Sequence, residues 1–238
     1  MTKIALGGLG DFLQMASSAI KERSVDIFTH SGDAGRVFFE GLGVSINTIE
    51  KFWTVNELGN LNINYSNLLD RDPFDLEGCY KALELSKENK IYDLAIHPFG
   101  SYYSMHNDTS LNRNIGKTFS CDMLQHILDK FRYKEIILLG TPQECSTFTE
   151  LIKRNANVTV KNTSIWDAIA ITCQAANFIG ADSFLKTART IYVKEKSSTT
   201  ILVERKVDHF RDKYFIEPYI DRANFIYYNS FDELKTIL

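Results

Sequence analysis

Apolar and polar residues alternate between strand-like and helix-like spacing from the start of the chain. A short apolar run over Lys3–Leu6 predicts a strand, and it leads into a glycine-rich turn at Gly7–Gly10. The apolar residues that follow recur at helical spacing, at Phe12, Met15, Ala16, Ala19 and Ile20. A β-turn-α unit is therefore predicted to open the chain.

The same alternation continues through the first half of the chain. Buried-type strands separated by segments of helical spacing are the pattern of a parallel sheet. Asn-rich or polar stretches interrupt it twice, and we expect loops there. The predicted elements are strand Val25–Thr29, helix Ala34–Gly43, strand Val44–Ile49, a loop over Asn56–Asp75, helix Leu76–Lys87, strand Tyr92–His97 and a loop over Tyr102–Lys117.

The second half repeats this alternation and then changes. Its regular part is predicted as helix Cys121–Phe131, strand Glu135–Leu139, turn Gly140–Pro142, helix Thr147–Arg154, strand Val158–Val160, helix Ser164–Ala175 and strand Asn177–Gly180. Three strands and a terminal helix follow, at Thr190–Lys194, Thr200–Glu204, Phe225–Tyr228 and Phe231–Leu238.

Together these elements predict an α/β protein of two Rossmann-like halves, with parallel sheets and a short C-terminal strand and helix extension. The long polar loop after His97 marks the expected junction between the halves. We therefore predict an N-terminal domain over residues 1–105 and a C-terminal domain, including the extension, over residues 106–238.

Composition narrows the functional classes. With a formal net charge of −3, the chain is not expected to hold nucleic acid mainly through a global positive field. Its four cysteines include no CxxC pair, so we predict reduced core thiols and no zinc or redox site. The N-terminus lacks the apolar segment of a signal peptide, and no run is long enough to span a membrane, so a cytoplasmic protein is expected.

The glycine turn carries the first candidate for chemistry. Gly8 and Gly10 allow a ligand to approach the backbone closely where a strand ends, although the third glycine of a dinucleotide-binding GxGxxG would fall at Leu13. Asp11 follows at the start of the predicted helix. It is either the residue that caps this helix or a general base that accepts a proton from an acceptor hydroxyl.

Three further candidates surround the long polar loop. His97 closes a strand and Ser101 follows it, at an edge where open α/β sheets bind ligands. A single histidine there is also a common structural hydrogen-bonding group. Lys117 precedes a helix and is suited to pair with a diphosphate as a point charge, although an isolated lysine is also ordinary solvated surface.

Two more strand ends complete the set. After the strand ending at Leu139, the turn places Gly140, Thr141 and Glu144 together; the carboxylate suits a ribose diol, or it caps the turn. After the strand ending at Gly180, Asp182 and Ser183 stand where a helix start would present backbone amides to a diphosphate.

Taken in order, these segments resemble the ADP-heptose heptosyltransferase family, glycosyltransferase family 9, which has the GT-B fold. The matching segments are Gly8-Leu9-Gly10-Asp11, Ile96-His97-Pro98, Lys117-Thr118-Phe119, Ile137–Gly140 with Glu144, and Ser164–Ser183. They extend over most of the chain up to about Arg189.

The resemblance implies a role for each matching residue. It makes Asp11 the catalytic base, Lys117 a contact of the donor phosphate, Glu144 a contact of the ribose, and Asp182 with Ser183 the diphosphate site. It also makes residues 1–105 the acceptor side and residues 106–238 the nucleotide-sugar side. The chain departs from the family at Phe184, where a glycine is usual, and Lys186 is a candidate to supply the charge of the family's histidine.

The leading hypothesis is a glycosyltransferase that moves a sugar from a nucleotide diphosphate sugar, with no cofactor and no metal ion. Its acceptor is expected to be an envelope saccharide, or a modified base in DNA if the protein comes from a phage. The alternative is a non-catalytic GT-B-like protein that binds a nucleotide or a partner. A dinucleotide-dependent oxidoreductase is the third possibility, and the incomplete glycine fingerprint weighs against it.

Overall fold

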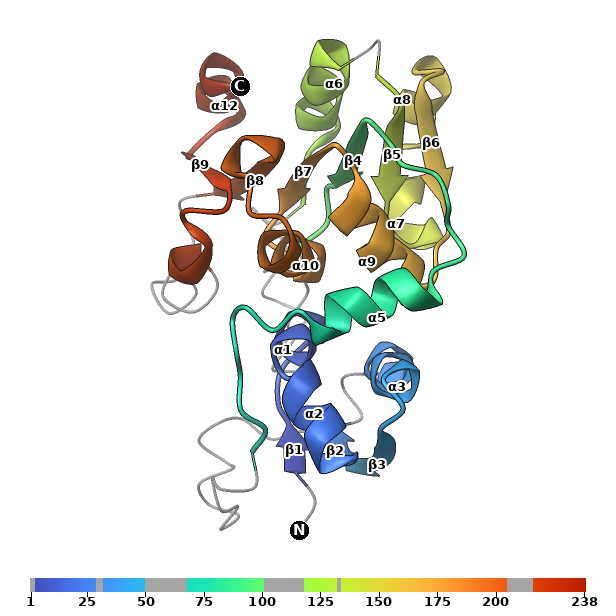
Figure 1. Ribbon diagram of the computed structural model, residues 1–238. Helices are drawn as coiled ribbons and strands as arrows, with labels where there is room; N and C mark the ends of the chain where they lie inside the picture. Colours follow the sequence, from blue (N-terminus) through green and yellow to red (C-terminus); the bar gives the residue numbers. More distant parts are fainter. Residues whose placement is uncertain (1–2, 29–31, 50–67, 101–117, 132–133, 205–215) are drawn as a thin grey trace.

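A computed structural model describes residues 3–28, 32–49, 68–100, 118–131, 134–204 and 216–238 (Figure 1). The first half forms a parallel sheet in the order β1–β2–β3. Its strands are β1 (Lys3–Ala5), β2 (Ser24–Phe28) and β3 (Ser45–Ile49), and its helices are α1 (Leu9–Gln14), α2 (Ala16–Glu22) and α3 (Gly32–Gly41). The predicted β-turn-α opening is therefore confirmed, with the helix divided at Met15.

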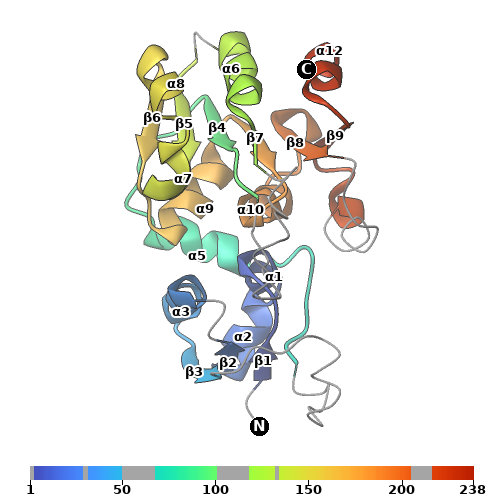
Figure 2. The same cartoon turned by 180° about the vertical axis from the view of Figure 1, so that it is seen from behind.

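The second sheet has six parallel strands in the order β6–β5–β4–β7–β8–β9 (Figure 2). They are β4 (Leu94–His97), β5 (Ile136–Leu139), β6 (Val158–Lys161), β7 (Asn177–Ala181), β8 (Thr199–Glu204) and β9 (Asn224–Tyr228). If these six strands are numbered 1 to 6 along the chain, starting with β4, their order across the sheet is 3-2-1-4-5-6. This is the order of a doubly wound fold, and its direction reverses between β4 and β7.

Alternate strand residues face two different helical layers. On β4, Leu94 and Ile96 pack on one side and Ala95 on the other. Helices α6, α8 and α12 cover the first side, and α9 and α10 cover the side that faces the first sheet, with α5 beneath them (Figure 1). The helices are α5 (Glu77–Leu85), α6 (Cys121–Lys130), α7 (Pro142–Ser146), α8 (Thr149–Arg154), α9 (Ile165–Gln174), α10 (Phe184–Tyr192) and α12 (Phe231–Ile237).

One predicted strand near the C-terminal end of the regular pattern is replaced by helix. The strand predicted at Thr190–Lys194 is wrong, because α10 continues to Tyr192. Its β-branched residues favour a strand, but the helix has already begun at Ser183 and buries Leu185, Ala188 and Ile191 on one side. The predicted C-terminal extension is present, and its strands β8 and β9 continue the six-stranded sheet.

The sheets also show where the chain passes from one half to the other. β4 was predicted to belong to the N-terminal domain, but it pairs with β5 and β7 in the second sheet. The passage therefore falls between β3 and β4, before the predicted boundary at 105/106, which lies within residues that the structure does not describe. The division into two domains stays a prediction.

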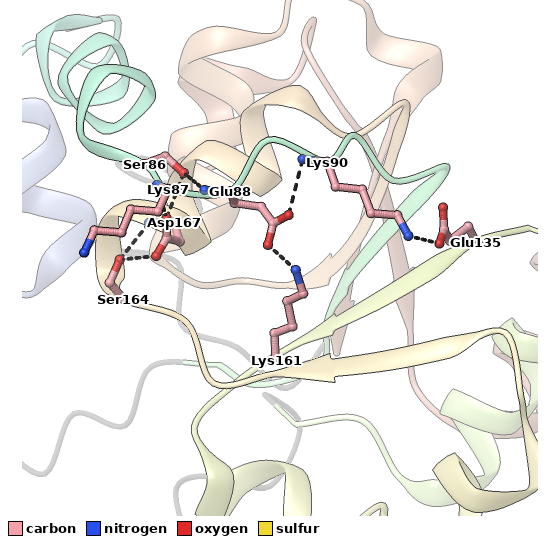
Figure 3. Close-up of polar contacts among 8 residues, drawn as sticks. All are labelled: Ser86, Lys87, Glu88, Lys90, Glu135, Lys161, Ser164 and Asp167. Atoms are coloured by element: carbon pink, nitrogen blue, oxygen red, sulfur yellow. Dashed lines mark hydrogen bonds and ion pairs between the residues drawn. The ribbon is translucent and has the colours of Figure 1, made fainter.

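Polar contacts fix the segment that joins the two sheets (Figure 3). After α5, the Ser86 hydroxyl and the Lys87 amide both donate to Asp167 Oδ1, each at 2.8 Å. Burial alone would raise the pKa of Asp167, but hydrogen bonds led by that from Ser164 lower it below the usual value. Further along, Glu88 pairs with Lys161, and Lys90 pairs with Glu135. The segment is thus held against α9, β5 and β6.

Apolar packing joins the two halves directly. The indole of Trp166 on α9 stacks on Phe38 of α3, with ring centroids 5.1 Å apart. Gly41 makes this contact possible, because a Cβ at that position would lie 2.3 Å from the indole. Residues of both sheets consequently share one buried core.

Arg189 on α10 fixes the end of α9. Its side chain is 1% exposed, and Nη1 donates to three carbonyl oxygens, at 2.9 Å to Thr172, 3.2 Å to Cys173 and 2.7 Å to Ala175. Nε donates to Thr199 Oγ1 on β8. Burial lowers the pKa of Arg189 to about 10, which leaves the guanidinium charged at neutral pH. One side chain thereby satisfies acceptors from α9 and β8.

We expect the substitution Arg189→Met to lower the free energy of unfolding by about 3 kcal/mol or more, because several buried carbonyl groups would lose their donors. Arg189→Lys should recover only part of this loss, since one ammonium cannot reproduce the planar fork. Urea denaturation of the three proteins measures both effects, and equal stability of wild type and Arg189→Met would contradict this role.

Candidate functional site

The site lies where the order of the second sheet reverses. Ligands of doubly wound proteins bind at this point, beyond the carboxyl ends of the strands. Here His97 ends β4 and Ser183 follows β7, and His97 Nδ1 lies 2.9 Å from Ser183 Oγ. Two residues predicted separately from sequence are thus in direct contact.

His97 is held as a neutral side chain. It is buried against the rings of Phe99 and Phe184, and burial lowers its pKa to about 3. Ser183 caps α10, and its Oγ accepts from the Lys186 amide at 3.4 Å. The same hydroxyl can donate to Nδ1 of a neutral imidazole, so His97 and the cap of α10 support each other.

The start of α1 forms the second part of the site. Gly7 has φ +106, and a Cβ there would lie 2.0 Å from Asp11 Oδ2, so only glycine fits. One of the two interpretations of Asp11 made it the cap of this helix, but Gly8 occupies that position and Asp11 stands three residues later. Its Oδ2 accepts from the Gly8 amide at 2.8 Å, so Asp11 stabilises the turn from within the first turn of the helix.

Gly10 brings the two parts together. A Cβ on Gly10 would lie 3.3 Å from Thr187 Oγ1 and 3.7 Å from Phe184 Cα. The first turn of α1 therefore rests directly on the first turn of α10, and motifs more than a hundred residues apart become neighbours. Gly10 thus lies against the helix whose cap, Ser183, contacts His97 and whose Lys186 pairs with Asp182.

Lys186 is the buried cation of the site. It is 0% exposed, and Nζ lies 3.1 Å from Asp182 Oδ1 and 5.3 Å from the ring centroid of Tyr219. Its charge also acts on Asp11 across the contact between the helices. An ammonium group so deep in the protein requires such partners, because desolvation disfavours an isolated charge.

Asp11 has a second cationic neighbour that the sequence did not reveal. Arg71 Nη1 lies 2.9 Å from Asp11 Oδ1. Burial raises the pKa of Asp11 above its usual value, while Arg71, the Gly8 amide and Lys186 each act to lower it. The carboxyl group is therefore buried, polarised and close to charged groups from both halves, as is common for a functional carboxylate.

The remaining predicted residues have different positions. Gly140 packs under Phe99, whose ring contacts His97. Thr141 and Glu144 form a capping box at α7: Glu144 Oε2 accepts from the Thr141 amide at 2.8 Å and from its hydroxyl at 2.9 Å. The capping interpretation of Glu144 is thus what the structure shows. Ser101 and Lys117 lie outside the described residues.

Three residues of the site carried no recognisable signal. Arg71 lies in a stretch predicted as loop, and Gln14 is an ordinary helical position. Tyr219 belongs to η5 (Glu217–Tyr219), and its hydroxyl accepts from Gln14 Nε2 at 2.6 Å. Their roles come from chain segments that meet only in the folded protein.

Other features lie apart from this site. A hollow of about 340 Å³ is lined by residues of α6 and of the α7–α8 region, and none of the predicted site residues lines it.

Within the described residues, no three His, Cys, Asp or Glu side chains are grouped to hold a metal ion. In those same parts, no helix has the length and apolarity to span a membrane. Cys121 is exposed, so the prediction of core thiols fails for it.

Sequence comparison identifies no relatives, since no protein-family model and no curated protein matches the chain. Structure comparison finds proteins of similar fold. The fold is similar to E. coli heptosyltransferase WaaC with ADP, at 11% identity and TM-score 0.50, over 90% of this chain and 71% of that one. It also matches a glycosyl transferase family 9 structure from Veillonella parvula, at 12% identity and TM-score 0.48, over 99% of this chain and 88% of that one.

These similarities establish the fold. The predicted α/β architecture with two parallel sheets, like that of the heptosyltransferase structure, is confirmed. The chain spans only 64% of the length of the WaaC structure with ADP-2-deoxy-2-fluoro heptose. The likeness to E. coli heptosyltransferase WaaC with ADP is a likeness of fold.

The buried neutral His97 predicts a specific acid sensitivity. Its pKa of about 3 lies below that of an unfolded histidine near 6.5, so the unfolded chain binds the extra proton first. Stability from this residue is complete above about pH 6.5 and is lost as pH falls towards 3, by roughly 1.4 kcal/mol per pH unit. Urea denaturation at pH 7, 6 and 5 should show that the free energy of unfolding falls less steeply with falling pH in His97→Gln than in wild type. Equal slopes for the two proteins would contradict this prediction.

Proposed function

We propose that the protein is a glycosyltransferase that uses a nucleotide diphosphate sugar. The observation that carries this proposal is the contact between α1 and α10, which sets Asp11 beside the start of α10 at the reversal point of the sheet. In this proposal the donor diphosphate lies at the first turn of α10, where backbone amides and the helix dipole favour an anion. Lys186 adds positive charge beneath that turn.

The transfer step then needs a proton acceptor. The acceptor hydroxyl attacks the anomeric carbon of the sugar, the bond from that carbon to the diphosphate oxygen breaks, and the hydroxyl proton passes to Asp11. The electrostatic field of α10 and Lys186 stabilises the departing diphosphate. Sugar identity and acceptor stay predictions: an envelope saccharide, or a modified base in DNA if the protein comes from a phage.

A second candidate function is binding of a nucleotide or a partner without turnover. Three observations favour it: Asp11 is already hydrogen-bonded to Gly8 and paired with Arg71, Glu144 is engaged in its capping box, and Phe184 stands where the resembled family has glycine. Donor binding without transfer would support this second function.

The donor prediction can be tested by thermal shift against ADP-, UDP-, GDP-, CMP- and dTDP-sugars, with NAD in parallel. A donor at one hundred times its Kd should stabilise the protein by about 2.7 kcal/mol. Ser183→Ala should weaken this effect, because it removes the cap of α10 and the contact with His97. Ser230→Ala, which removes an equivalent cap on α12, is the matched control and should leave it unchanged. No shift with any nucleotide sugar would reject the proposal.

Asp11→Asn tests the catalytic step. With a donor and acceptor pair identified from a panel, we expect donor binding to persist and the transfer rate to fall by about 10²- to 10⁴-fold, the usual contribution of a general base. Release of the nucleoside diphosphate measures the rate. A variant as fast as wild type would show that Asp11 is not the base.

A further inference from the structure

The two oxygens of the Asp11 carboxylate have different neighbours: Oδ2 accepts a hydrogen bond, whereas Oδ1 accepts none from the described residues and has an ion-pair contact. Oδ2 accepts from the Gly8 amide at 2.8 Å, and this contact belongs to the turn itself. Oδ1 faces Arg71, whose Nη1 lies 2.9 Å away. The side chain of Asp11 is 11% exposed and that of Arg71 is 40% exposed, so Arg71 is the more solvent-accessible member of the pair.

Arg71 is itself anchored at the end of the first sheet. Its Nη2 donates to the Leu6 carbonyl oxygen at 3.3 Å, directly after β1. The neighbouring Leu68 forms a parallel bridge with Ile4 of β1, and the Asp72 amide donates to the Gln14 carbonyl at 2.7 Å. The guanidinium fork thus joins the end of β1 to the carboxylate on α1, a geometry that a single ammonium does not reproduce.

The charged and titratable groups around Asp11 come from three other segments. Arg71 approaches from the segment after Leu69, Lys186 from α10, and Tyr219 from η5. Lys186 also pairs with Asp182, and Tyr219 is a neutral phenol whose pKa burial raises. Asp70 and Asp72, on either side of Arg71, are exposed. Arg71 contacts Asp11 directly and is the partly exposed member of this group of charges.

Resting on the proposed function of Asp11, we propose that Arg71 is a positioning residue that orients the Asp11 carboxylate and favours its ionised form. Its Nη1 contacts Asp11 Oδ1, and its Nη2 donates to the Leu6 carbonyl oxygen at the end of β1. The inference adds to the proposed mechanism a residue from the connecting segment. Lys186 also acts on Asp11, and in the proposed mechanism it lies on the donor side.

The test is the titration of Asp11 in protein labelled with ¹³C at the aspartate carboxyl groups, followed by NMR. The resonance missing from Asp11→Asn identifies the group. In Arg71→Gln the titration midpoint should rise by about one pH unit, because loss of a nearby positive charge disfavours the carboxylate. Arg71→Lys should restore most of that midpoint but not the transfer rate, since it keeps the charge and loses the fork.

Arg36→Gln is the matched control, because Arg36 pairs with Asp33 and Glu40 on α3 and its loss changes the net charge equally. It should leave the Asp11 midpoint unchanged. An unchanged midpoint in Arg71→Gln would overturn the inference. If acid unfolding hides the titration, the melting temperatures of wild type and Asp11→Asn are compared against pH. The melting temperature of wild type relative to that of Asp11→Asn should rise as pH falls, because the folded protein favours the protonated Asp11 carboxyl. When both proteins also carry Arg71→Gln, this rise should begin at higher pH.

Activity separates this inference from the proposed function. With transfer present, the acid limb of the pH–rate profile should move to higher pH in Arg71→Gln, and an unmoved limb would reject the positioning role. With transfer absent from wild type under all donors, the proposed function fails, while a shifted Asp11 midpoint would still establish the action of Arg71 on the carboxylate.

Discussion

The structure depends on the close contact between the first turns of α1 and α10. Gly10 permits it, since a side chain there would meet Thr187 and the backbone of Phe184. The contact places the start of α1, which carries Asp11, beside the N-terminal end of α10 from the other half. Around it, Trp166 and Phe38 extend the same interface as apolar core. The start of α1 is thus packed on the same core that joins the two sheets.

This contact also accounts for the unusual number of buried charges. Lys186 is fully buried and Asp11 nearly so, and each would be unstable alone at such depth. They are retained with Asp182 and Arg71 as partners, an arrangement that contributes little net stability compared with apolar packing. This charge network lies at the reversal point of the sheet, which is why the proposed function is placed there.

Other charged groups in the protein have a purely structural explanation. Arg189 satisfies the carbonyl groups at the end of α9, and Asp167 holds the segment that joins the two sheets. Glu144 closes its own capping box. These residues show that an unusual environment alone does not identify a site. Asp11 and Lys186 differ because they come from opposite halves and meet where the sheet order reverses.

The sequence by itself determined most strands and helices, the parallel α/β class and the strand ends at which His97, Asp11 and Ser183 lie. Local spacing and turn chemistry are enough for these features, because they are set by residues close together in the chain. The sequence failed at Thr190–Lys194, where a helix begun at Ser183 overrides the preference of β-branched residues for strands.

Only the tertiary structure decided that β4 belongs to the second sheet, that α1 rests on α10, and that Arg71 and Tyr219 lie beside Asp11 and Lys186. These relations join segments dozens to hundreds of residues apart. They follow from which buried faces pack together, and no spacing within a single segment encodes that choice.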